Sequence, residues 1–270
     1  MTTGALILAF NNEQTDYIQL AAWTANNIRK HLKIPVALIT DSADHPLLSS
    51  HFDKVISAHP DAGGPRHFRD YNKTVTWYNA GRVDAYDLSP WDQTLLLDAD
   101  YVVASDALNS VLQSTQEFLA HQTAMDATGE NDFSGLNYFG AFNMPMWWAT
   151  VVMFRRSQSV KMIFDSMKMI RANWAHYRHL YQTGNSVYRN DHALSIALGL
   201  VNGHTMDHAK IPWSLVSVLP EHQVTELGED HYSIQYINCK NQNRRVTLKG
   251  QDFHAMGKKH LGDLVAKSFA

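Results

Sequence analysis

The 270-residue chain contains one cysteine, Cys239, and no long hydrophobic run. One thiol cannot form an intrachain disulfide, and it cannot supply the ligands of a zinc finger. The longest apolar stretch, residues 144–154, is too short to cross a bilayer as a helix. Residues 5–10 follow no basic residue, so this run is expected to be a first strand and not a signal peptide. We therefore expect a soluble, cytoplasmic protein without a membrane partner.

The net charge of −3 conceals an uneven distribution along the chain. Residues 1–135 contain 8 Lys and Arg against 17 Asp and Glu, whereas residues 136–270 contain 15 against 9. A basic half can mark a surface that binds an anion. Charges that are counted along the sequence need not cluster in space, however, so a chance difference between two surfaces explains the numbers equally well.

The first half alternates strand-like and helix-like segments, which is typical of βαβ units with a largely parallel sheet. Strands are predicted at residues 4–10, 36–40, 54–57 and 94–97, and helices at residues 16–31 and 71–86. With 45% hydrophobic residues, the chain can bury one substantial core. The fold class predicted for residues 1–270 is a single α/β domain with a mixed, mainly parallel sheet flanked by helices.

The second half is less regular. Helices are predicted at residues 105–119, 160–179 and 190–200 and from residue 261, and strands at residues 151–154, 214–219, 233–237 and 246–248. Residues 129–148 are predicted to form a long loop that is rich in aromatic side chains. A loop of this length in a compact domain is usually functional.

Two carboxylates, Asp98 and Asp100, follow the predicted strand at residues 94–97. In open α/β sheets, ligands bind at the carboxyl ends of the strands. Side chains two residues apart on an extended chain point the same way, so the pair can share one divalent cation beside a diphosphate. Without a cation or a proton, the two charges would repel each other. The structural alternative is a helix-capping Asp next to a solvated one.

A second motif, Asp-Phe-His-Ala-Met-Gly-Lys-Lys-His, covers residues 252–260. His254 offers an imidazole to the same metal, and Gly257 lets the backbone approach a phosphate. Lys258 or Lys259 can neutralise a leaving diphosphate. In a chain with 15 histidines, a single histidine is more often a partly buried structural residue than a ligand. The Gly-Lys-Lys that follows His254 favours a functional role for it.

The two motifs, in this order, resemble those of GT-A-fold glycosyltransferases, and among them the glycogenin-like family 8 enzymes. In that family a strand-terminal Asp-x-Asp and a late His-x-x-Gly-x-x-Lys bind manganese and the nucleoside diphosphate. The resemblance covers residues 4–260 and implies that Asp98, Asp100 and His254 bind Mn²⁺ or Mg²⁺. It also implies retention of anomeric configuration.

The chain departs from the family pattern at two places. Position 260 is His where the family has Lys, so the phosphate contact falls loosely to Lys258 or Lys259. The family's Asn-Ala-Gly-Val strand opening has only a rough counterpart in the Trp-Ala-Thr-Val of residues 148–151. This second departure leaves the recognition of the sugar open.

The resemblance implies that residues 1–135 bind a nucleotide-sugar donor, by family habit a UDP-sugar. Donor contacts would come from Asn11 and Asn12 after the first strand, and from Asp41 after the second. Lys73, on the helix predicted before the Asp-x-Asp strand, would be a basic donor contact, and Arg82 is a weaker candidate. All of these have an ordinary alternative as turn residues or as solvated helix positions.

Residues 136–270 would then form the acceptor half. Arg189 and Asp191 start a predicted helix that resembles the acidic helix start on the acceptor side of this fold. Asp191 would orient or deprotonate the acceptor hydroxyl, which would also serve an inverting enzyme, or it merely caps the helix. Trp147 and Trp148 would stack on a sugar or a base, or pack in the core.

The basic residues of the second half could form a surface for a polyanion. They are Arg155, Arg156, Lys161, Lys168, Arg171, Arg178, Arg189, Lys240, Arg244 and Arg245. Residues 10–17 and 37–41 resemble glycosyltransferase-like proteins of tailed bacteriophages, some of which glycosylate hydroxymethylated bases in their own DNA. This implies duplex DNA as the acceptor, in the host cytoplasm if the chain is phage-encoded. A carbohydrate acceptor is the alternative.

Two other classes stay open, and the sequence does not set the oligomeric state. Haloacid-dehalogenase-type phosphatases also place Asp-x-Asp after an apolar strand, but on the first strand and followed by Gly or Thr. Here the motif begins at Asp98 and continues with Tyr101. A non-catalytic nucleotide-binding module would bind a diphosphate without turnover.

Overall fold

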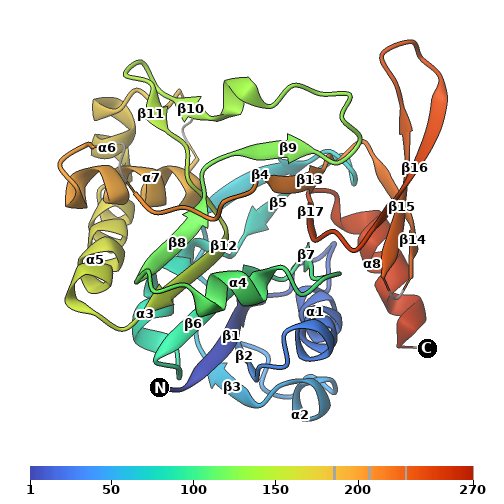
Figure 1. Ribbon diagram of the computed structural model, residues 1–270, viewed down its shortest axis with the longest axis horizontal. Coiled ribbons are helices and arrows are strands. Elements are labelled where there is room, and N and C mark those ends of the chain that lie inside the picture. Colours follow the sequence, from blue (N-terminus) through green and yellow to red (C-terminus); the bar gives the residue numbers. More distant parts are fainter. Residues whose placement is uncertain (185–186, 206–207, 229, 270) are drawn as a thin grey trace.

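A six-stranded sheet in the order β3-β2-β1-β6-β12-β8 forms the centre of the molecule (Figure 1). The computed structural model describes residues 1–184, 187–205, 208–228 and 230–269. The central strands are β1 (Thr3–Leu8), β2 (Val36–Thr40), β3 (Lys54–Ser57), β6 (Gln93–Asp98), β8 (Phe118–His121) and β12 (Trp148–Arg155). β1, β2, β3 and β6 run parallel, and β12 is antiparallel to β6 and β8. The predicted α/β class with a mainly parallel sheet is confirmed.

Helices cover the central strands, which explains their continuous apolar runs. The helices are α1 (Tyr17–His31), α2 (Leu48–His51), α3 (Ala85–Leu88), α4 (Leu108–Gln113), α5 (Gln158–Ala172), α6 (Trp174–Leu180), α7 (Asn190–Val201) and α8 (Lys258–Ser268). In Figure 1, α1 and α8 lie on one side of the sheet and α5 to α7 on the other. Asp16 caps α1, because its side chain accepts the N–H of Gln19.

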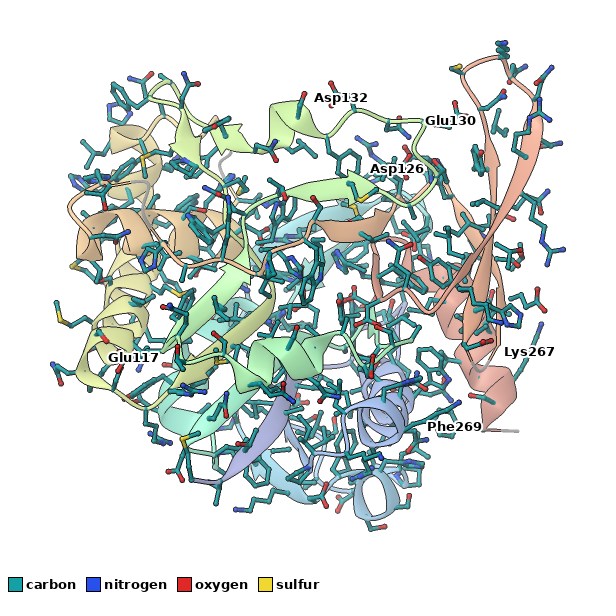
Figure 2. The ribbon with its side chains drawn as sticks, in the orientation of Figure 1. Glu117, Asp126, Glu130, Asp132, Lys267 and Phe269 are labelled. Atoms are coloured by element: carbon teal, nitrogen blue, oxygen red, sulfur yellow. The ribbon has the colours of Figure 1, made fainter. Side chains whose placement is uncertain are left out.

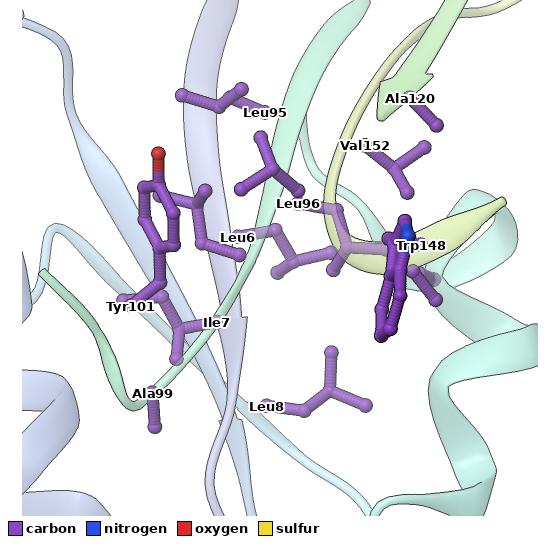
Figure 3. Packing of buried hydrophobic residues seen from close by; sticks show 14 of the residues in the cluster. Leu6, Ile7, Leu8, Leu95, Leu96, Ala99, Tyr101, Ala120, Trp148 and Val152 are labelled. Carbon is purple, nitrogen blue, oxygen red and sulfur yellow. The ribbon is translucent and has the colours of Figure 1, made fainter. Parts of the chain in front are cut away.

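The core between these layers is built by residues in register on neighbouring strands. Leu6 of β1 pairs with Leu96 of β6, which pairs with Val152 of β12 (Figure 3). All three are buried, and each such side chain contributes about 1.5–3 kcal/mol by leaving water. This rigid apolar platform ends at Asp98, the last residue of β6, so the strand fixes where that carboxylate lies.

A second sheet, in the order β7-β17-β13-β9, brings the two halves of the sequence together. Its strands are β7 (Tyr101–Val102), β9 (Ala124–Asp126), β13 (Leu215–Val218) and β17 (Phe253–Ala255). β17 is antiparallel to β7, with His254 opposite Tyr101. This pairing places the imidazole of the late motif beside the Asp-x-Asp segment, from which it is separated by about 150 positions of sequence.

The remaining elements lie around the cleft or project from the body. They are β4 (Gly64–Phe68), β5 (Lys73–Trp77), β10 (Tyr138–Phe139), β11 (Met144–Pro145), β14 (Gln223–Leu227), β15 (His231–Ile237), β16 (Asn243–Lys249) and the 3-10 helices η1 (Ala80–Asp84) and η2 (Ser134–Leu136). The β15–β16 hairpin projects from the body in Figure 1. Asp126, which Figure 2 labels beside Glu130, holds the turn after β9 by accepting from Thr128 and Asn131.

Three predictions about secondary structure are wrong, at least in part. The helix predicted at residues 71–86 is the strand β5 followed by η1 and α3, because Thr74, Val75 and Thr76 are β-branched and pair with β4. The helix predicted at residues 105–119 ends at Gln113, and its last residues belong to β8. The predicted loop at residues 129–148 contains η2 and the β10–β11 pair.

Among the described residues, no helix is both long and apolar enough to cross a membrane.

Candidate active site

A cleft of 580 Å³ lies at the carboxyl ends of β1 and β6. This is the edge at which open α/β sheets bind ligands, and the volume is typical of a small-molecule site. The wall opposite the sheet is the β4–β5 hairpin, and the other walls are the start of β12, the start of α7 and the β17–α8 segment. Both halves of the sequence therefore line the cleft.

Asp98, Asp100 and His254 meet in this cleft as the sequence motifs predict. One potential ligand atom from each residue lies within 4.8 Å of the other two. The Nε2 atom of His254 is 3.5 Å from Oδ1 of Asp100. Two carboxylates and an imidazole are a donor set that suits a divalent cation such as Mn²⁺. The side chains present therefore fit the metal that the resemblance implies.

A buried arginine holds Asp98. Nη1 of Arg82 donates to Oδ1 of Asp98 at 2.8 Å, and Nδ2 of Asn79 donates to the same atom at 3.2 Å. Arg82 is 2% exposed and also donates to the carbonyl oxygens of Leu96 and Thr150. Burial raises the pKa of Asp98, Arg82 opposes this rise and the charge of Asp100 adds to it. The arginine therefore fixes the orientation of this carboxylate and offsets its charge.

Asp100 has a different cation. Its carboxylate forms an ion pair with Nζ of Lys258, which also donates to the carbonyl oxygens of Ala255 at 3.0 Å and Met256 at 3.1 Å. Burial opposes ionisation, but Lys258 and His254 outweigh it and lower the pKa of Asp100. Lys258 therefore holds a ligand of the candidate metal site, instead of projecting freely toward a phosphate.

The first turn of α8 lies beside these residues. Gly257 is its N-cap, and a Cβ there would lie 3.2 Å from the carbonyl oxygen of Pro220, so the backbone approaches closely. Oδ2 of Asp70, in the β4–β5 turn, accepts the backbone N–H groups of Lys258 at 2.6 Å and Lys259 at 3.0 Å. Helix N-termini favour anions, and here a carboxylate of the chain takes that place. The Lys259 side chain is exposed and lies outside the lining of the cleft.

Asp191, in the first turn of α7, faces the same cleft. Its Oδ1 accepts the N–H of Ala149 at 2.9 Å, and its Oδ2 pairs with Nη2 of Arg189 at 2.9 Å. Burial opposes ionisation, but Arg189 and the hydrogen bond from Ala149 lower the pKa of Asp191. A carboxylate whose two oxygens are both occupied is a fixed negative charge and a poor general base.

Of the five donor contacts predicted in the first half, Asn12 and the weaker candidate Arg82 line the cleft, and the other three lie outside its lining. Asn12 holds the turn before α1 by accepting from Gln14 and Thr15, and Asn11 accepts from Ile18. Asp41 is exposed at the end of β2. Lys73 lies on the strand β5 with an exposed side chain, and not on a helix.

The two predicted tryptophans have separate places. Trp148, at the start of β12, lines the cleft although it is 7% exposed. Trp147 is buried away from the cleft, where its backbone N–H donates to Ser195. Only Trp148 can therefore contact a ligand in this cleft.

No protein-family model and no curated protein matches this chain. Similar solved structures include the glycosyltransferase GlyE of Streptococcus pneumoniae TIGR4, with 12% identity and a TM-score of 0.45 over 78% of this chain and 46% of GlyE. The galactosyltransferase LgtC, solved with donor and acceptor sugar analogues, has 14% identity and a TM-score of 0.44 over 72% of this chain and 70% of LgtC.

A third similar structure is a putative glucose-1-phosphate thymidylyltransferase from Bacillus anthracis, in complex with a sucrose. It has 11% identity and a TM-score of 0.39 over 77% of this chain and 98% of its own. The present chain spans less than half the length of GlyE. At TM-scores below 0.5, these likenesses assign neither a family nor an activity to it.

Several residues of the cleft escaped sequence reasoning. Arg66 and Asp70 come from the β4–β5 hairpin, and Asn79 comes from the turn before η1. Arg82 of η1 was expected only as a weaker donor contact, whereas its guanidinium holds Asp98. Strand β5, the turn after it and η1 lie in the wrongly predicted helix at residues 71–86, so their side chains had no assigned direction. The β-branched run at residues 74–76 is the signal that would have found the hairpin.

Proposed function

We propose that the protein is a metal-dependent glycosyltransferase that takes its sugar from a nucleotide-sugar donor. The observation that carries this proposal is the meeting of Asp98, Asp100 and His254 at the ligand-binding edge of the sheet, beside the first turn of α8. The order of the two motifs, which resembles that of family 8 enzymes, supports it. A bound Mn²⁺ or Mg²⁺ would stabilise the charge on the departing diphosphate.

The transfer exchanges one bond at the anomeric carbon. The acceptor hydroxyl oxygen forms a bond to that carbon, while the bond from the carbon to the phosphate oxygen breaks. The nucleoside diphosphate leaves with the electron pair, and the hydroxyl proton passes to its departing oxygen. Asp191, as a fixed negative charge, would stabilise the positive charge that develops on the sugar. Its weak basicity favours retention of configuration over inversion, and anomeric analysis of the product would decide between them.

The proposed division assigns the donor to the half formed by residues 1–135 and the acceptor to residues 136–270. A UDP-sugar is the proposed donor and a hydroxymethylated base in duplex DNA the proposed acceptor. Trp148 and Arg189, in the cleft, support an aromatic or anionic acceptor. Other basic residues named for DNA binding are engaged locally, since Lys161 and Arg245 pair with Asp165 and Glu226. A carbohydrate acceptor is therefore the alternative.

One experiment tests both levels of the proposal. The protein would be incubated with Mn²⁺ and a panel of nucleotide sugars, and with hydroxymethylated DNA, unmodified DNA or a neutral oligosaccharide. Mass spectrometry would detect the nucleoside diphosphate and the product. We expect metal-dependent turnover that is lost in Asp100→Asn and kept in Lys249→Gln, which removes an exposed charge on strand β16. If no nucleotide sugar is consumed, the proposal is wrong.

The phosphatase alternative has less support from the geometry. Those enzymes need a free carboxylate as nucleophile, whereas Asp98 is held by Arg82 and Asn79, and Asp100 by Lys258. Phosphate release from an aryl phosphate would favour the phosphatase. A nucleotide-binding module would bind UDP with Mn²⁺ and leave every nucleotide sugar intact.

A further inference from the structure

Arg66 lines the cleft, and contacts with its neighbours fix the position of its guanidinium. The guanidinium carbon lies 3.6 Å from the ring centroid of Trp77, on the adjacent strand of the hairpin. Its Nη2 donates to the carbonyl oxygen of Tyr188 at 3.2 Å. A Cβ at Gly63 would collide with the Trp77 ring, so the glycine leaves room for it. The guanidinium is therefore pre-positioned, which lowers the entropy that a ligand must remove.

The second cation beside it is Arg189, which follows Tyr188 in the sequence. Arg189 pairs with Asp191, whereas no carboxylate among the described residues lies within ion-pair distance of Arg66. Among the described residues, the two guanidinium groups therefore have one carboxylate, Asp191, within ion-pair distance of either. Burial and, after it, the charge of Arg189 lower the pKa of Arg66 to about 10, while Asp191, Tyr17 and Asp98 oppose the shift. An added anion would relieve this repulsion.

The carboxylates of the candidate metal site have no such surplus of positive charge beside them. Asp98 pairs with Arg82, and Asp100 pairs with Lys258. The charges of a divalent cation and of a nucleotide-sugar diphosphate cancel each other when both bind there. The carboxylate of Asp70 accepts from the first turn of α8. Binding of the donor therefore leaves Arg66 without a carboxylate at ion-pair distance among the described residues.

We propose that Arg66 and Arg189 bind an anionic group of the acceptor, a carboxylate or a phosphate close to the hydroxyl that receives the sugar. This inference rests on the proposed function and names the substrate class of the same site. An Arg pair provides forked donors that match the oxygens of either group. The carboxylate would come from an acidic sugar and the phosphate from a nucleic acid or another phosphodiester.

Matched pairs of probes test the inference through binding, in the presence of UDP and Mn²⁺. One pair is methyl glucuronide and methyl glucoside, and the other is a hydroxymethylcytosine dinucleotide and its nucleoside. Isothermal titration should show that the charged member of one pair binds at least about tenfold more tightly than its neutral twin, the effect of one charged hydrogen bond. The pair that shows this preference identifies the source of the anion.

Variants of the arginine give the control. Arg66→Gln should reduce the preference to about twofold or less, and Arg66→Lys should keep part of it because the charge remains but the fork is lost. Lys249→Gln, which removes an exposed cation of β16, should keep the whole preference. Thermal unfolding of each variant would show that it is folded when its binding is measured.

Three results would overturn the inference. The wild-type protein could bind charged and neutral probes equally, or Arg66→Gln could keep the preference. Arg66→Gln could also weaken the binding of UDP with Mn²⁺ as much as that of the charged probe, in which case Arg66 serves the donor. Failure of the proposed function is read separately, as the absence of nucleotide-sugar breakdown by the wild-type protein.

Discussion

Two groups of charged side chains in the cleft have different arrangements. At the carboxyl end of β6, each of two carboxylates has its own cation, Arg82 for Asp98 and Lys258 for Asp100. In the second group, Arg189 pairs with Asp191, and no carboxylate among the described residues lies within ion-pair distance of Arg66. The carboxylates of the first group are paired before any ligand binds, whereas the second group keeps a surplus positive charge.

This difference indicates which group binds a metal with a diphosphate and which group binds an anion alone. A balanced pair of buried carboxylates can accept a metal and a diphosphate, whose charges cancel, without a large change in the field of the cleft. A surplus cation gains most from a ligand that brings an uncompensated anion. Removing a charge from the first group should therefore reduce stability or activity. Removing a charge from the second group should mainly alter the choice of ligand.

The largest effect is expected of Asp100→Asn. It removes a ligand of the candidate metal site, and such a metal contributes several kcal/mol to the stabilisation of a leaving diphosphate, so turnover should fall by about 1,000-fold. The measurements are release of nucleoside diphosphate and titration with Mn²⁺, with thermal unfolding as the test of folding. If the folded variant kept near-normal turnover, Asp100 would not bind a metal that the reaction needs.

Arg82→Met should cost about 3 kcal/mol of unfolding free energy, because it leaves the carboxylate of Asp98 buried without a cation. We expect the low end of the range that is usual for breaking a buried ion pair, because the Asp98 side chain is still 21% exposed. Urea denaturation of Arg82→Met, Asp98→Asn and the double variant measures the coupling. The double variant should recover part of the loss, and a fully additive loss would contradict the pairing.

Arg66→Gln should change the unfolding free energy by less than about 1 kcal/mol. The lost stacking on Trp77 and the lost hydrogen bond to Tyr188 oppose the relief of repulsion with Arg189. The same urea titration compares it with Arg82→Met. If Arg66→Gln lowered the unfolding free energy as much as Arg82→Met does, the two groups of charged side chains would not differ in their contribution to stability.

At neutral pH the smallest effect should come from the titration of His192, in the first turn of α7. Burial and, after it, Arg189 lower its pKa to about 4, although Asp191 opposes and Arg66 adds to the shift. The unfolded chain takes up the proton near pH 6.5, so this stability is complete above pH 6.5 and is lost as the pH falls toward 4. The contribution is at most about 1.4 kcal/mol per pH unit.

His192→Gln should flatten the pH dependence of the unfolding free energy between pH 6.5 and 4. Urea denaturation at several pH values in this window would measure the slope. An unchanged slope would show that His192 is not held neutral beside the arginines.

The motifs of the candidate site could be predicted because they depend on local order in the sequence. The apolar run before Asp98 and the glycine and lysines after His254 carry their signal within ten residues. The strands at residues 36–40 and 54–57 were predicted with the bounds that the structure shows, because both runs are short and contain β-branched residues, which favours a strand over a helix.

The partners of these motifs could not be predicted, because they come from segments whose structure depends on distant pairing. The β4–β5 hairpin supplies Arg66 and Asp70, and its second strand lies in the helix predicted at residues 71–86. Its strand β5 is stabilised by pairing with β4 and by the stacking of Arg66 on Trp77, and neither contact has a periodic signal. The roles of Asn11, Asp41 and Lys73 as donor contacts stay predictions.

The sequence by itself determined the α/β class, the edge at which the two aspartates stand, and the identity of the imidazole that joins them. Only the tertiary structure decided which cation belongs to which carboxylate, and that Arg66 has no carboxylate partner among the described residues. The physical reason is that apolar periodicity and turn residues act over a few positions, whereas charge balance depends on distances across the cleft, which the pairing of β17 with β7 and of β4 with β5 sets.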